Sequence, residues 1–436
     1  MKAATLESKF PILAVEHDCI ISKDADITVA YKVELPELFT VTRNEYEAIH
    51  SAWAKAVKVL PNYSIVHRQD WFIEENYTPD IQRDDLSFLS RSFERHFNER
   101  PYLRHTSYLF LTKTTKERSR TQSNFTALTR NFIIPKEMQD KDTVTRFLES
   151  CDQFERIIND SGFVRITRMR KDEITGTENS AGIIEKYFSL SQEETTWLQD
   201  LTLGAAEMKV GDNCLCLHTL SDTDDLPGKV ATDMRYERLS TDRSDCRLSF
   251  AAPIGVLLTC NHIVNQYLFI DDPAENLKKF EKQARNMHSL SRYSRSNQIN
   301  REWIEEYLNE AHSLGLTSIR AHCNVLAWSD DRNRLKQIKN DVGSQLALME
   351  CKPRHNTVDT PTLFWAAIPG NAGDFPFEES YYTFIEQALC FFIGESCSRD
   401  SLSPFGIRMV DRLTGKPVHL DISCLLYTSP SPRDGL

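Results

Sequence analysis

Apolar residues recur at helical spacing in several segments of the chain and cluster into strand-like runs between them. The first clear helix follows Thr42, which forms a capping box with Glu45. Behind this box the apolar positions recur every three or four residues, as on one face of a helix. These positions are Tyr46, Ile49, Trp53, Val57 and Leu60. We therefore expect a helix that ends at Pro61.

The same reasoning predicts further elements along the whole chain. Helices are expected at 88–97 (ending before Pro101), at 143–159, in a short segment capped by Ser191 that carries Trp197, Leu198 and Leu201, from Asp272 to Met287, from Trp303 to Gly315, and at 335–349. Strands are expected at 10–15, 27–33, 63–72, 105–112, 163–169, 254–270 and 318–328.

Two polar stretches, 171–182 and 221–245, are rich in Asp, Thr, Ser and Gly and are interpreted as loops or insertions. Helices and strands otherwise follow one another with long connections. This order predicts an α+β fold, in which helices cover antiparallel or mixed sheets. No repeat of fixed period is visible. We expect an N-terminal α/β domain at 1–170, a second α/β region at 171–403 and a pair of strands at 404–423.

The composition limits the class of protein. Of 436 residues, 40% are hydrophobic and 26% charged, as in ordinary globular proteins. The formal net charge of −11 disfavours broad binding of nucleic acid, which depends on neutralising phosphates. No apolar run reaches the roughly 20 residues that span a bilayer, and the N-terminus has no secretory h-region. We therefore expect a cytoplasmic protein whose 11 cysteines are buried thiols rather than disulfides.

A nucleotide-binding loop of the form G-x-x-x-x-G-K-[ST] is absent from the sequence. Its glycines would wrap the phosphates, its Lys would reach the terminal phosphates and its hydroxyl would hold Mg²⁺. The two Gly-Lys pairs, Gly228-Lys229 and Gly415-Lys416, are followed by Val230 and Pro417, so neither has the hydroxyl. Both are interpreted as turns. We expect no catalytic residue and no cofactor-binding residue in this chain.

Metal and nucleophile chemistry also lack a complete motif. Cys214 and Cys216 lie two residues apart, but no second Cys or His pair stands at zinc spacing. The pairs Cys260–His262 and His322–Cys323 have the same defect, and G-x-S-x-G does not occur. Core thiols are the simpler interpretation. A metal or thiol enzyme built on these Cys and His residues remains an alternative hypothesis, and stoichiometric zinc in the purified protein would favour it.

Two groups of basic residues are candidates for contact with nucleic acid or an anionic membrane surface. The simpler interpretation is a solvated loop over 113–129 and a solvated helix face, and the acidic net charge favours it. The first group is Lys113, Lys116, Arg118 and Arg120, with Arg130; the second is Arg285, Arg292, Arg295 and Arg301.

The C-terminal half carries a family resemblance. The segment 364–371 reads FWAAIPGN, and 372–375 and an expected helix over 381–392 follow it. Residues 404–421 then resemble the strand pair that leads into the P-loop of an ATPase family. Together with the openings at 5–12 and 24–33, this order resembles the TraG-type ATPases of conjugative transposons over residues 1–423. The tripeptide Pro369-Gly370-Asn371 matches the family's PGN block, and its order relative to the flanking segments makes the likeness specific.

The resemblance implies an ATPase that powers DNA transfer and pilus assembly through a conjugation channel related to type IV secretion. It implies ATP and Mg²⁺ in the parent protein, self-association into rings, and attachment to inner-membrane and other channel components at the inner face of the inner membrane. The family's ATP site would lie beyond this chain, so this part would be a docking and assembly module. The alternative is a nucleic-acid-contacting module of the same apparatus that uses the basic clusters.

The end of the chain departs from the family pattern. Residues 424–436, CLLYTSPSPRDGL, resemble a translated sequencing adapter. We therefore expect a non-native tail that replaces the path into the motor domain.

Overall fold

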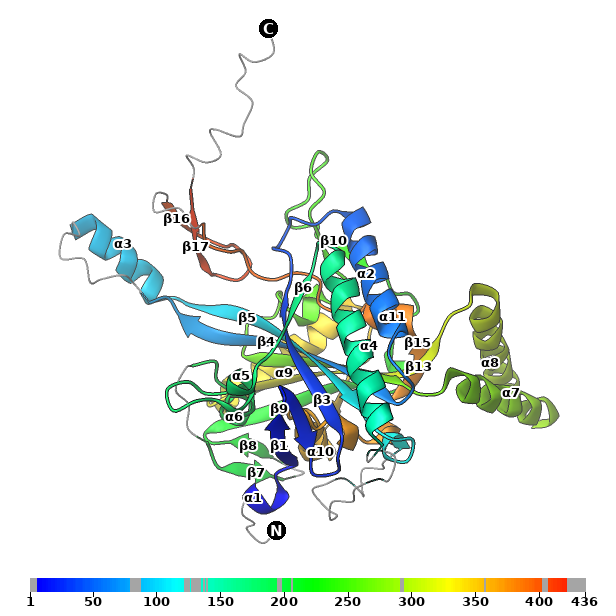
Figure 1. The fold of residues 1–436 in the computed structure, drawn as a ribbon. Helices are drawn as coiled ribbons and strands as arrows, with labels where there is room; N and C mark the ends of the chain where they lie inside the picture. Colours follow the sequence, from blue (N-terminus) through cyan, green and yellow to red (C-terminus); the bar gives the residue numbers. More distant parts are fainter. Residues whose placement is uncertain are drawn as a thin grey trace.

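Thirteen strands form one antiparallel sheet, which is the framework of the molecule (Figure 1). The structure is a computed structural model, and it describes residues 6–78, 88–120, 126, 135, 138, 140–193, 198–204, 207–290, 294–356, 358–401 and 407–421. The strands of this sheet are β1 Ile12–Glu16, β2 Cys19–Ser22, β3 Ile27–Glu34, β4 Ser64–Asn76, β5 Pro101–Lys113, β6 Arg165–Arg168, β7 Leu201–Leu203, β8 Met208–Val210, β9 Asn213–Leu220, β12 His262–Ile270, β13 Ser318–Ser329, β14 Arg354–Asn356 and β15 Tyr381–Phe384.

Two separate hairpins and a set of helices complete the described elements. The hairpins are β10 Asp233–Arg235 with β11 Arg247–Ser249, and β16 Ile407–Val410 with β17 Pro417–Leu420. The α-helices are α1 Leu6–Lys9, α2 Arg43–Lys58, α3 Phe88–Asn98, α4 Lys141–Asp160, α5 Lys171–Thr175, α6 Ile183–Ser189, α7 Pro273–Leu290, α8 Arg295–Leu314, α9 Arg332–Leu348, α10 Thr360–Ala366 and α11 Ile385–Leu389. Short 3₁₀ turns are η1 Arg118–Arg120, η4 Thr223–Asp225, η5 Ala252–Ile254, η6 Ala372–Asp374 and η7 Phe377–Glu379.

The sheet consists of two units with the same topology. In the first unit, β3, α2, β4, β5, α4 and β6 follow one another, and the strands lie in the order β6-β3-β5-β4. In the second unit, β9, β12, β13, α9 and β14 give the equivalent order β14-β9-β13-β12. This is the antiparallel strand order of a ferredoxin-like βαββαβ unit. The second unit has the segment 221–261 where the first has α2.

The two units join edge to edge through antiparallel pairing of β4 with β12. Hairpin β1–β2 pairs with β3 on the same side as β6, and β7–β8 pairs with β9 on the same side as β14. The main strand order is therefore palindromic about the joint. The repeat is one of topology, because the sequence shows no repeat of fixed period. Strands from both sides of residue 170, where a domain boundary is predicted, therefore belong to one sheet.

Helices cover both faces of this sheet. On one face α2, α4, α9 and α11 pack on the sheet through two apolar clusters, one in each half. On the other face the cover consists of α6, α10 and the segment that follows α10. The central strands are therefore buried on both sides, and every residue of β13 is buried.

Each unit carries a helical arm at the tip of its central hairpin (Figure 1). Helix α3 connects β4 to β5, and the helical hairpin α7–α8 connects β12 to β13. Because β4 and β12 are antiparallel, their C-terminal ends, at which these arms begin, lie at opposite ends of the paired strands. Figure 1 shows α3 and α7–α8 extending in opposite directions from the body.

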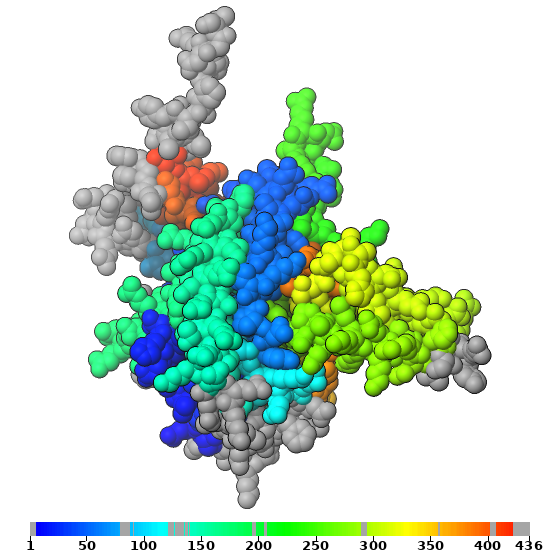
Figure 2. Space-filling view, turned by 45° about the vertical axis from the view of Figure 1, so that its right-hand side comes forward, coloured from blue at the N-terminus to red at the C-terminus, as the bar shows by residue number. Residues whose placement is uncertain are grey.

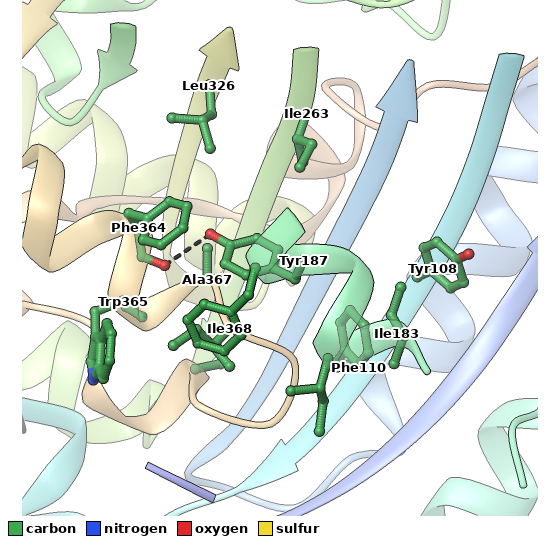
Figure 3. Packing of buried hydrophobic residues seen from close by; sticks show 14 of the residues in the cluster. Tyr108, Phe110, Ile183, Tyr187, Ile263, Leu326, Phe364, Trp365, Ala367 and Ile368 are labelled. Atoms are coloured by element: carbon green, nitrogen blue, oxygen red, sulfur yellow. Dashed lines mark hydrogen bonds between the residues drawn. The ribbon is translucent and has the colours of Figure 1, made fainter. Parts of the chain in front are cut away.

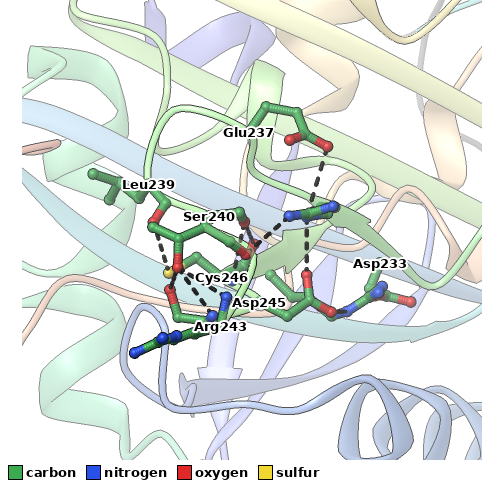
Figure 4. A network of polar contacts seen from close by, with 11 residues as sticks. Asp233, Glu237, Leu239, Ser240, Arg243, Asp245 and Cys246 are labelled. Carbon is green, nitrogen blue, oxygen red and sulfur yellow. Dashed lines mark hydrogen bonds and ion pairs between the residues drawn. The ribbon is translucent and has the colours of Figure 1, made fainter.

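A projecting loop joins β10 to β11, as Figures 1 and 2 show. Ion pairs and hydrogen bonds hold it together (Figure 4). Arg247 pairs with Asp233 and, at 2.6 Å, with Asp245. The Ser240 hydroxyl donates to the carbonyl of Cys246 and accepts from its N–H, at 3.2 and 3.1 Å. The polar stretch 221–245, predicted as a loop or insertion, thus contains the first strand of a β-hairpin, whose second strand follows directly after it.

Most of the predicted long elements are confirmed, and so is the α+β class. Helices α2, α3, α4, α7, α8 and α9 and the strand pair β16–β17 lie where periodicity or resemblance placed them. The capping box is formed, since the Thr42 N–H donates to the Glu45 carboxylate at 2.7 Å. The Asp272 side chain caps α7 as expected, because its carboxylate accepts a hydrogen bond from the Ala274 N–H at 3.0 Å.

Several predicted elements are wrong. The helix expected over 381–392 is a strand, β15, followed by the short α11, because Tyr381–Phe384 pairs with the edge of β13. Leu201, predicted in a helix, begins β7, and residues 194–197 of that helix lie outside the described residues. The stretch 254–270 holds η5 and a single strand, β12. Helices α5 and α6 are too short for periodicity to reveal.

Candidate functional site

The PGN tripeptide forms a buried turn between α10 and η6. The Asn371 N–H donates to the carbonyl of Ile368 at 2.8 Å, and the Asn371 side-chain amide donates to the carbonyl of Trp365, also at 2.8 Å. The Asn371 carbonyl accepts from the N–H of Asp374 at 3.0 Å and so starts η6. Asn371 is only 2% exposed. This asparagine therefore closes the turn at both ends, once through its backbone and once through its side-chain amide.

Gly370 is required by both conformation and space. Its φ is +90°, a region that L side chains rarely adopt. A Cβ at this position would lie 2.5 Å from Cγ2 of Ile20, on strand β2. The turn therefore packs directly on the N-terminal hairpin, and only glycine allows the approach.

Residues on both sides of the turn fill the apolar core of this face (Figure 3). Phe364, Trp365, Ala367 and Ile368 pack with Tyr187 of α6 and with residues of the central strands, among them Phe110, Ile263 and Leu326. The Tyr187 hydroxyl donates to the carbonyl of Phe364 at 2.8 Å. The block thus acts as a cover that reaches both units of the sheet.

Beneath this cover, polar side chains cross the joint between the two units. Gln69 of β4 donates to the Asn265 side-chain oxygen at 2.8 Å and to the carbonyl of Ala367 at 2.7 Å. Asn265 of β12 donates to Asn324 of β13 at 3.0 Å. Asn324 contacts the His322 ring at 2.9 Å, whose other nitrogen is 2.6 Å from the carbonyl of Glu379. This ladder satisfies polar groups that burial would otherwise penalise.

Two neutral imidazoles belong to the ladder. Burial lowers the pKa of His67 and of His322 to about 3. Both rings are therefore uncharged near neutral pH. His67 contacts the Asn265 side-chain oxygen at 3.2 Å and stacks on Tyr267 at 4.0 Å between ring centroids. The ladder carries no net charge, which fits its place in the interior.

An ion cluster lies beside the PGN turn and involves one of the predicted nucleic-acid residues. The Arg118 guanidinium pairs with Asp24 and with Asp26, each at 2.7 Å, and all three side chains are buried. Burial works to lower the pKa of Arg118, but Asp26 and Asp24 outweigh it and leave the pKa raised. A Cβ on Gly373 would lie 2.2 Å from the Asp26 carboxylate. The structure thus brings Arg118 and the PGN segment together through Asp26.

A second buried guanidinium ties the same region to the other unit. Arg320 of β13 pairs with Asp271 at 2.6 Å and donates to the carbonyl of Ser119, in η1, at 2.7 Å. Its guanidinium lies over the rings of Phe269 and Phe377. Arg118 and Arg320 therefore fix η1 from two sides.

The other members of the first basic group also have partners within the chain. Lys113 is buried and donates to the carbonyl of Asn62 at 2.5 Å. Lys116 and Arg120 both pair with Glu275 at the start of α7, at 2.5 and 3.5 Å. The expectation of an exposed loop is wrong for residues 113–115, 118 and 119, because strand β5 extends to Lys113 and because Arg118 and Ser119 of η1 are buried. Arg130 lies outside the described residues.

The second basic group lies on the α7–α8 arm. Arg285 is on α7, and Arg295 and Arg301 are on α8, whereas Arg292 lies outside the described residues. Arg301 pairs with Glu305 one turn later at 2.6 Å. The arm carries glutamates among its arginines, so its charge is mixed.

On the opposite face of the sheet, a hydrogen-bonded relay joins Asp70, His105 and Ser396. The His105 ring contacts the Asp70 carboxylate through Nε2 at 3.1 Å and the Ser396 hydroxyl through Nδ1 at 3.0 Å. Arg68 also donates to Asp70 at 3.1 Å. Burial works to raise the pKa of Asp70, but Arg68 and His105 outweigh it and hold the pKa below its usual range.

The relay has the residue types of a nucleophilic triad but lacks its surroundings. The Ser396 N–H donates to the carbonyl of Pro36 at 2.8 Å, so it is not available to an oxyanion. A cavity close to Ser396 in the sequence has Glu37, Thr40 and Arg399 among its lining residues, and Ser396 does not line it. The relay is best described as a link between β4, β5 and the segment after α11.

Beside the relay, Glu395 is fully buried and collects three hydrogen bonds. Its carboxylate accepts from the Tyr46 hydroxyl and from the Ser249 N–H and hydroxyl, each at 3.0 Å. Burial raises the pKa of this carboxyl to about 7, although these hydrogen bonds work against the rise. Glu395 therefore links α2 with β11, and so connects the two units on this face.

The remaining predicted motifs lie in structural positions. Gly415 has a φ of +72° in the turn between β16 and β17, and Gly228 is in the surface segment after η4. Cys214 and Cys216 are buried in the apolar cluster under α9. Within the described ranges, no group of three or more His, Cys, Asp or Glu side chains is placed to hold a metal ion. In the same part of the chain, no helix is long and apolar enough to cross a membrane.

Comparison with known proteins gives one partial match. Residues 1–51 match a family model described as "Domain of unknown function, B. Theta Gene description (DUF3875)". The match covers β1, β2, β3 and the first half of α2. No curated protein matches the chain. The likeness is compatible with a protein from a Bacteroides conjugative element.

The sequence identified some of these residues and missed others. The alternation of Arg320, His322 and Asn324 with apolar residues in β13 was visible, and it marks the polar ladder. In β4, His67 and Gln69 alternate with other residues in the same way, and this alternation could have predicted that they share the face of the sheet that carries the ladder. The relay had no local signal, because 35 residues separate Asp70 from His105 and 291 separate His105 from Ser396.

Replacing Gly370 by Ala tests the turn. A left-handed backbone costs a non-glycine residue about 1–2 kcal/mol, and the added methyl group also displaces Ile20. We expect the free energy of unfolding, measured by urea titration, to fall by at least this amount. Gly343→Ala is the control, because its Cβ has open space inside α9, and it should leave stability unchanged or raise it by up to about 1 kcal/mol. Equal effects of the two substitutions would contradict the described turn.

Replacing Glu395 by Gln tests the buried carboxyl. Between its ordinary pKa and about 7, the folded protein holds a proton that the unfolded chain has released, so rising pH in this interval disfavours folding. Gln can keep the hydrogen bonds to Tyr46 and Ser249 without the proton. Urea unfolding should therefore show Glu395→Gln gaining stability relative to wild type between about pH 5 and about pH 8. The exposed Glu117→Gln should show no such trend, and a flat difference for Glu395→Gln would contradict the assignment.

Proposed function

We propose that the chain is the N-terminal docking and assembly part of a conjugative-transfer ATPase, and that its role is to bind other components of the transfer apparatus. The ATP and Mg²⁺ of the parent protein would be held by a motor domain outside this chain. Its location would be peripheral, at the cytoplasmic side of the inner membrane.

The observation that carries the proposal is the place of the PGN block in the fold. The residues on which the resemblance rests close a buried turn and cover the joint between two units. Their requirements are those of packing and hydrogen bonding, as Gly370 and Asn371 show. A block with this role supports a module that fixes the shape of the N-terminal region, rather than one that acts on a substrate.

Three further observations support it. The match of residues 1–51 to a family named from B. Theta agrees with an origin in a Bacteroides mobile element. Both Gly-Lys pairs lack the hydroxyl that holds Mg²⁺. The basic residues considered for nucleic acid, from Lys113 to Arg120, are engaged by carboxylates and carbonyls of the chain itself, so the alternative of a nucleic-acid-contacting module gains no support from them.

The motor domain provides the test. In a longer reading frame from the same locus, we expect a G-x-x-x-x-G-K-[ST] motif after a short apolar strand beyond Ser423, because the family places its ATP site there. The longer protein should hydrolyse ATP, and the 436-residue chain should not. ATP hydrolysis by this chain at the rate of the longer protein would overturn the proposal, and so would a long continuation without the motif.

A further inference from the structure

The central sheet has a notch where β12 begins later than its two neighbours end. The first residue of β12, His262, pairs with Phe72 of β4 and with Ala327 of β13. Beyond these pairs, β4 continues to Asn76 and β13 continues to Ser329. At this end of the sheet, β4 and β13 therefore extend past the strand that separates them. We call the space between these two strand ends the β12 notch.

Asn261 forms the floor of the β12 notch. Its side-chain oxygen accepts from the Glu74 N–H at 2.7 Å, and its carbonyl accepts from the Trp328 N–H at 3.2 Å. The chain before Asn261 leaves the sheet, because Cys260 is buried in the apolar cluster under α9. The path that an earlier part of β12 would take between β4 and β13 is thus not taken by the chain itself.

A cavity of about 550 Å³ lies in the β12 notch. This volume falls within the range of about 300–1,000 Å³ that is typical of ligand sites. Glu74, Glu75 and Asn76 line the cavity from β4, and residues 328–330 line it from the end of β13. Because two of its walls are strand ends, its shape suits an extended chain.

The wall that β4 forms presents backbone groups for a further strand. Residues along an antiparallel strand direct their N–H and C=O groups to alternate neighbours. Glu74 directs its N–H to Asn261, so Asn76 directs its N–H and C=O to the same side, into the notch. Pro101, which is opposite Asn76 in β5, has no N–H to offer. Among the described residues, no strand pairs with β4 on this side beyond Phe72.

The other edge of the same two-stranded ribbon is covered. Pairing of β5 with β3 begins only at Ser107, so the earlier residues of β5 need another cover. The segment after α11 supplies it, since the Cys397 thiol donates to the carbonyl of Leu103 at 3.6 Å. Ser396 contacts the His105 ring beside it. Proteins usually block free strand edges in this way, and an edge that faces a cavity is suited to accept an added strand.

The side chains around the notch favour a basic guest. Glu74 pairs with Arg334 and Glu75 with Arg104, both at 3.1 Å. Asp330 is exposed and has no ion pair within the described ranges. The lining holds these three carboxylates but only one guanidinium, that of Arg334. A lysine or arginine of a guest would be attracted to Asp330, whereas an acidic residue would be repelled.

We propose that the β12 notch binds an extended basic segment of another protein, which adds to β4 as a short antiparallel strand in line with β12. Backbone hydrogen bonds to Glu74 and Asn76 supply affinity, and a lysine or arginine near Asp330 supplies selectivity. The inference rests on the proposed docking role and deepens it, because it names one docking site and the chemistry of the segment that occupies it.

Hydrogen exchange on the 436-residue chain locates the binding. The probe is a short peptide of alternating threonine and lysine, and its counterpart has glutamate in place of lysine. We expect the Asn76 amide to exchange fast in the chain alone and to be protected by the lysine peptide but not by the glutamate peptide. Protection in the chain alone would show that a segment of this chain fills the notch, and would overturn the proposal. Lack of protection by the lysine peptide would also overturn it.

Substitution of Asn76 tests strand addition separately from charge. Asn76→Pro removes the N–H that faces the notch and takes no hydrogen bond from the pairing with β5. We expect its affinity for the lysine peptide, measured by fluorescence anisotropy, to fall by about fivefold or more, as the loss of a backbone hydrogen bond predicts. Asn76→Ala keeps the N–H and should bind as wild type does. Equal affinities of the two variants would contradict strand addition.

Substitution of Asp330 tests the selectivity. Asp330→Lys should weaken binding of the lysine peptide by about threefold or more. Asp242→Lys is the control, because Asp242 is an exposed carboxylate of the β10–β11 loop and does not line the notch. Equal effects of the two substitutions would show unspecific attraction to an acidic chain and would overturn the basic partner. Failure of these tests would leave the proposed function standing, since the motor-domain test addresses it separately.

Discussion

The antiparallel pairing of β4 with β12 is the contact on which the other features of the molecule depend. It joins the edge strands of two similar units, and its register sets Gln69 opposite Asn265. Both side chains are buried, and their hydrogen bond at 2.8 Å continues the ladder into β13. Because the pairing is antiparallel, the two arms begin at opposite ends of the paired strands. The shape of the molecule thus follows from one strand contact.

Polar residues are buried on both faces of this joint, and their value lies in specificity as much as in stability. An unpaired amide in this interior would cost free energy, and a shifted register of β4 and β12 would separate Gln69 from Asn265, so the ladder favours the observed register. The PGN turn completes the arrangement, because Ala367 accepts from Gln69 and Gly373 lies against Asp26. A segment late in the chain therefore depends on residues near its beginning.

Periodicity predicted the long helices and most strands, because an amphipathic face of four or five turns leaves a repeated signal in the sequence. It failed at β15, because the helix expected over 381–392 began on Tyr381–Phe384, whose residue types favour a strand and which pair with β13. For the site, the sequence marked Pro369–Asn371 and Arg118 separately. Asp26 brings the two together, because it pairs with Arg118 and lies against Gly373, just after the tripeptide. This contact depends on tertiary packing, and so does the relay of Asp70, His105 and Ser396. The duplicated topology could not be read from the sequence, since the two units share strand order and not residues.

Hydrogen exchange of the backbone amides tests most directly whether the joint unites the two units. If the β4–β12 pairing holds them as one cooperative structure, the amides of β4, β5, β12 and β13 should exchange together and more slowly than those of the arms. Exchange of β9, β12 and β13 at a common rate clearly faster than that of β3, β4 and β5 would show that the units open independently, and would contradict the central role of this contact.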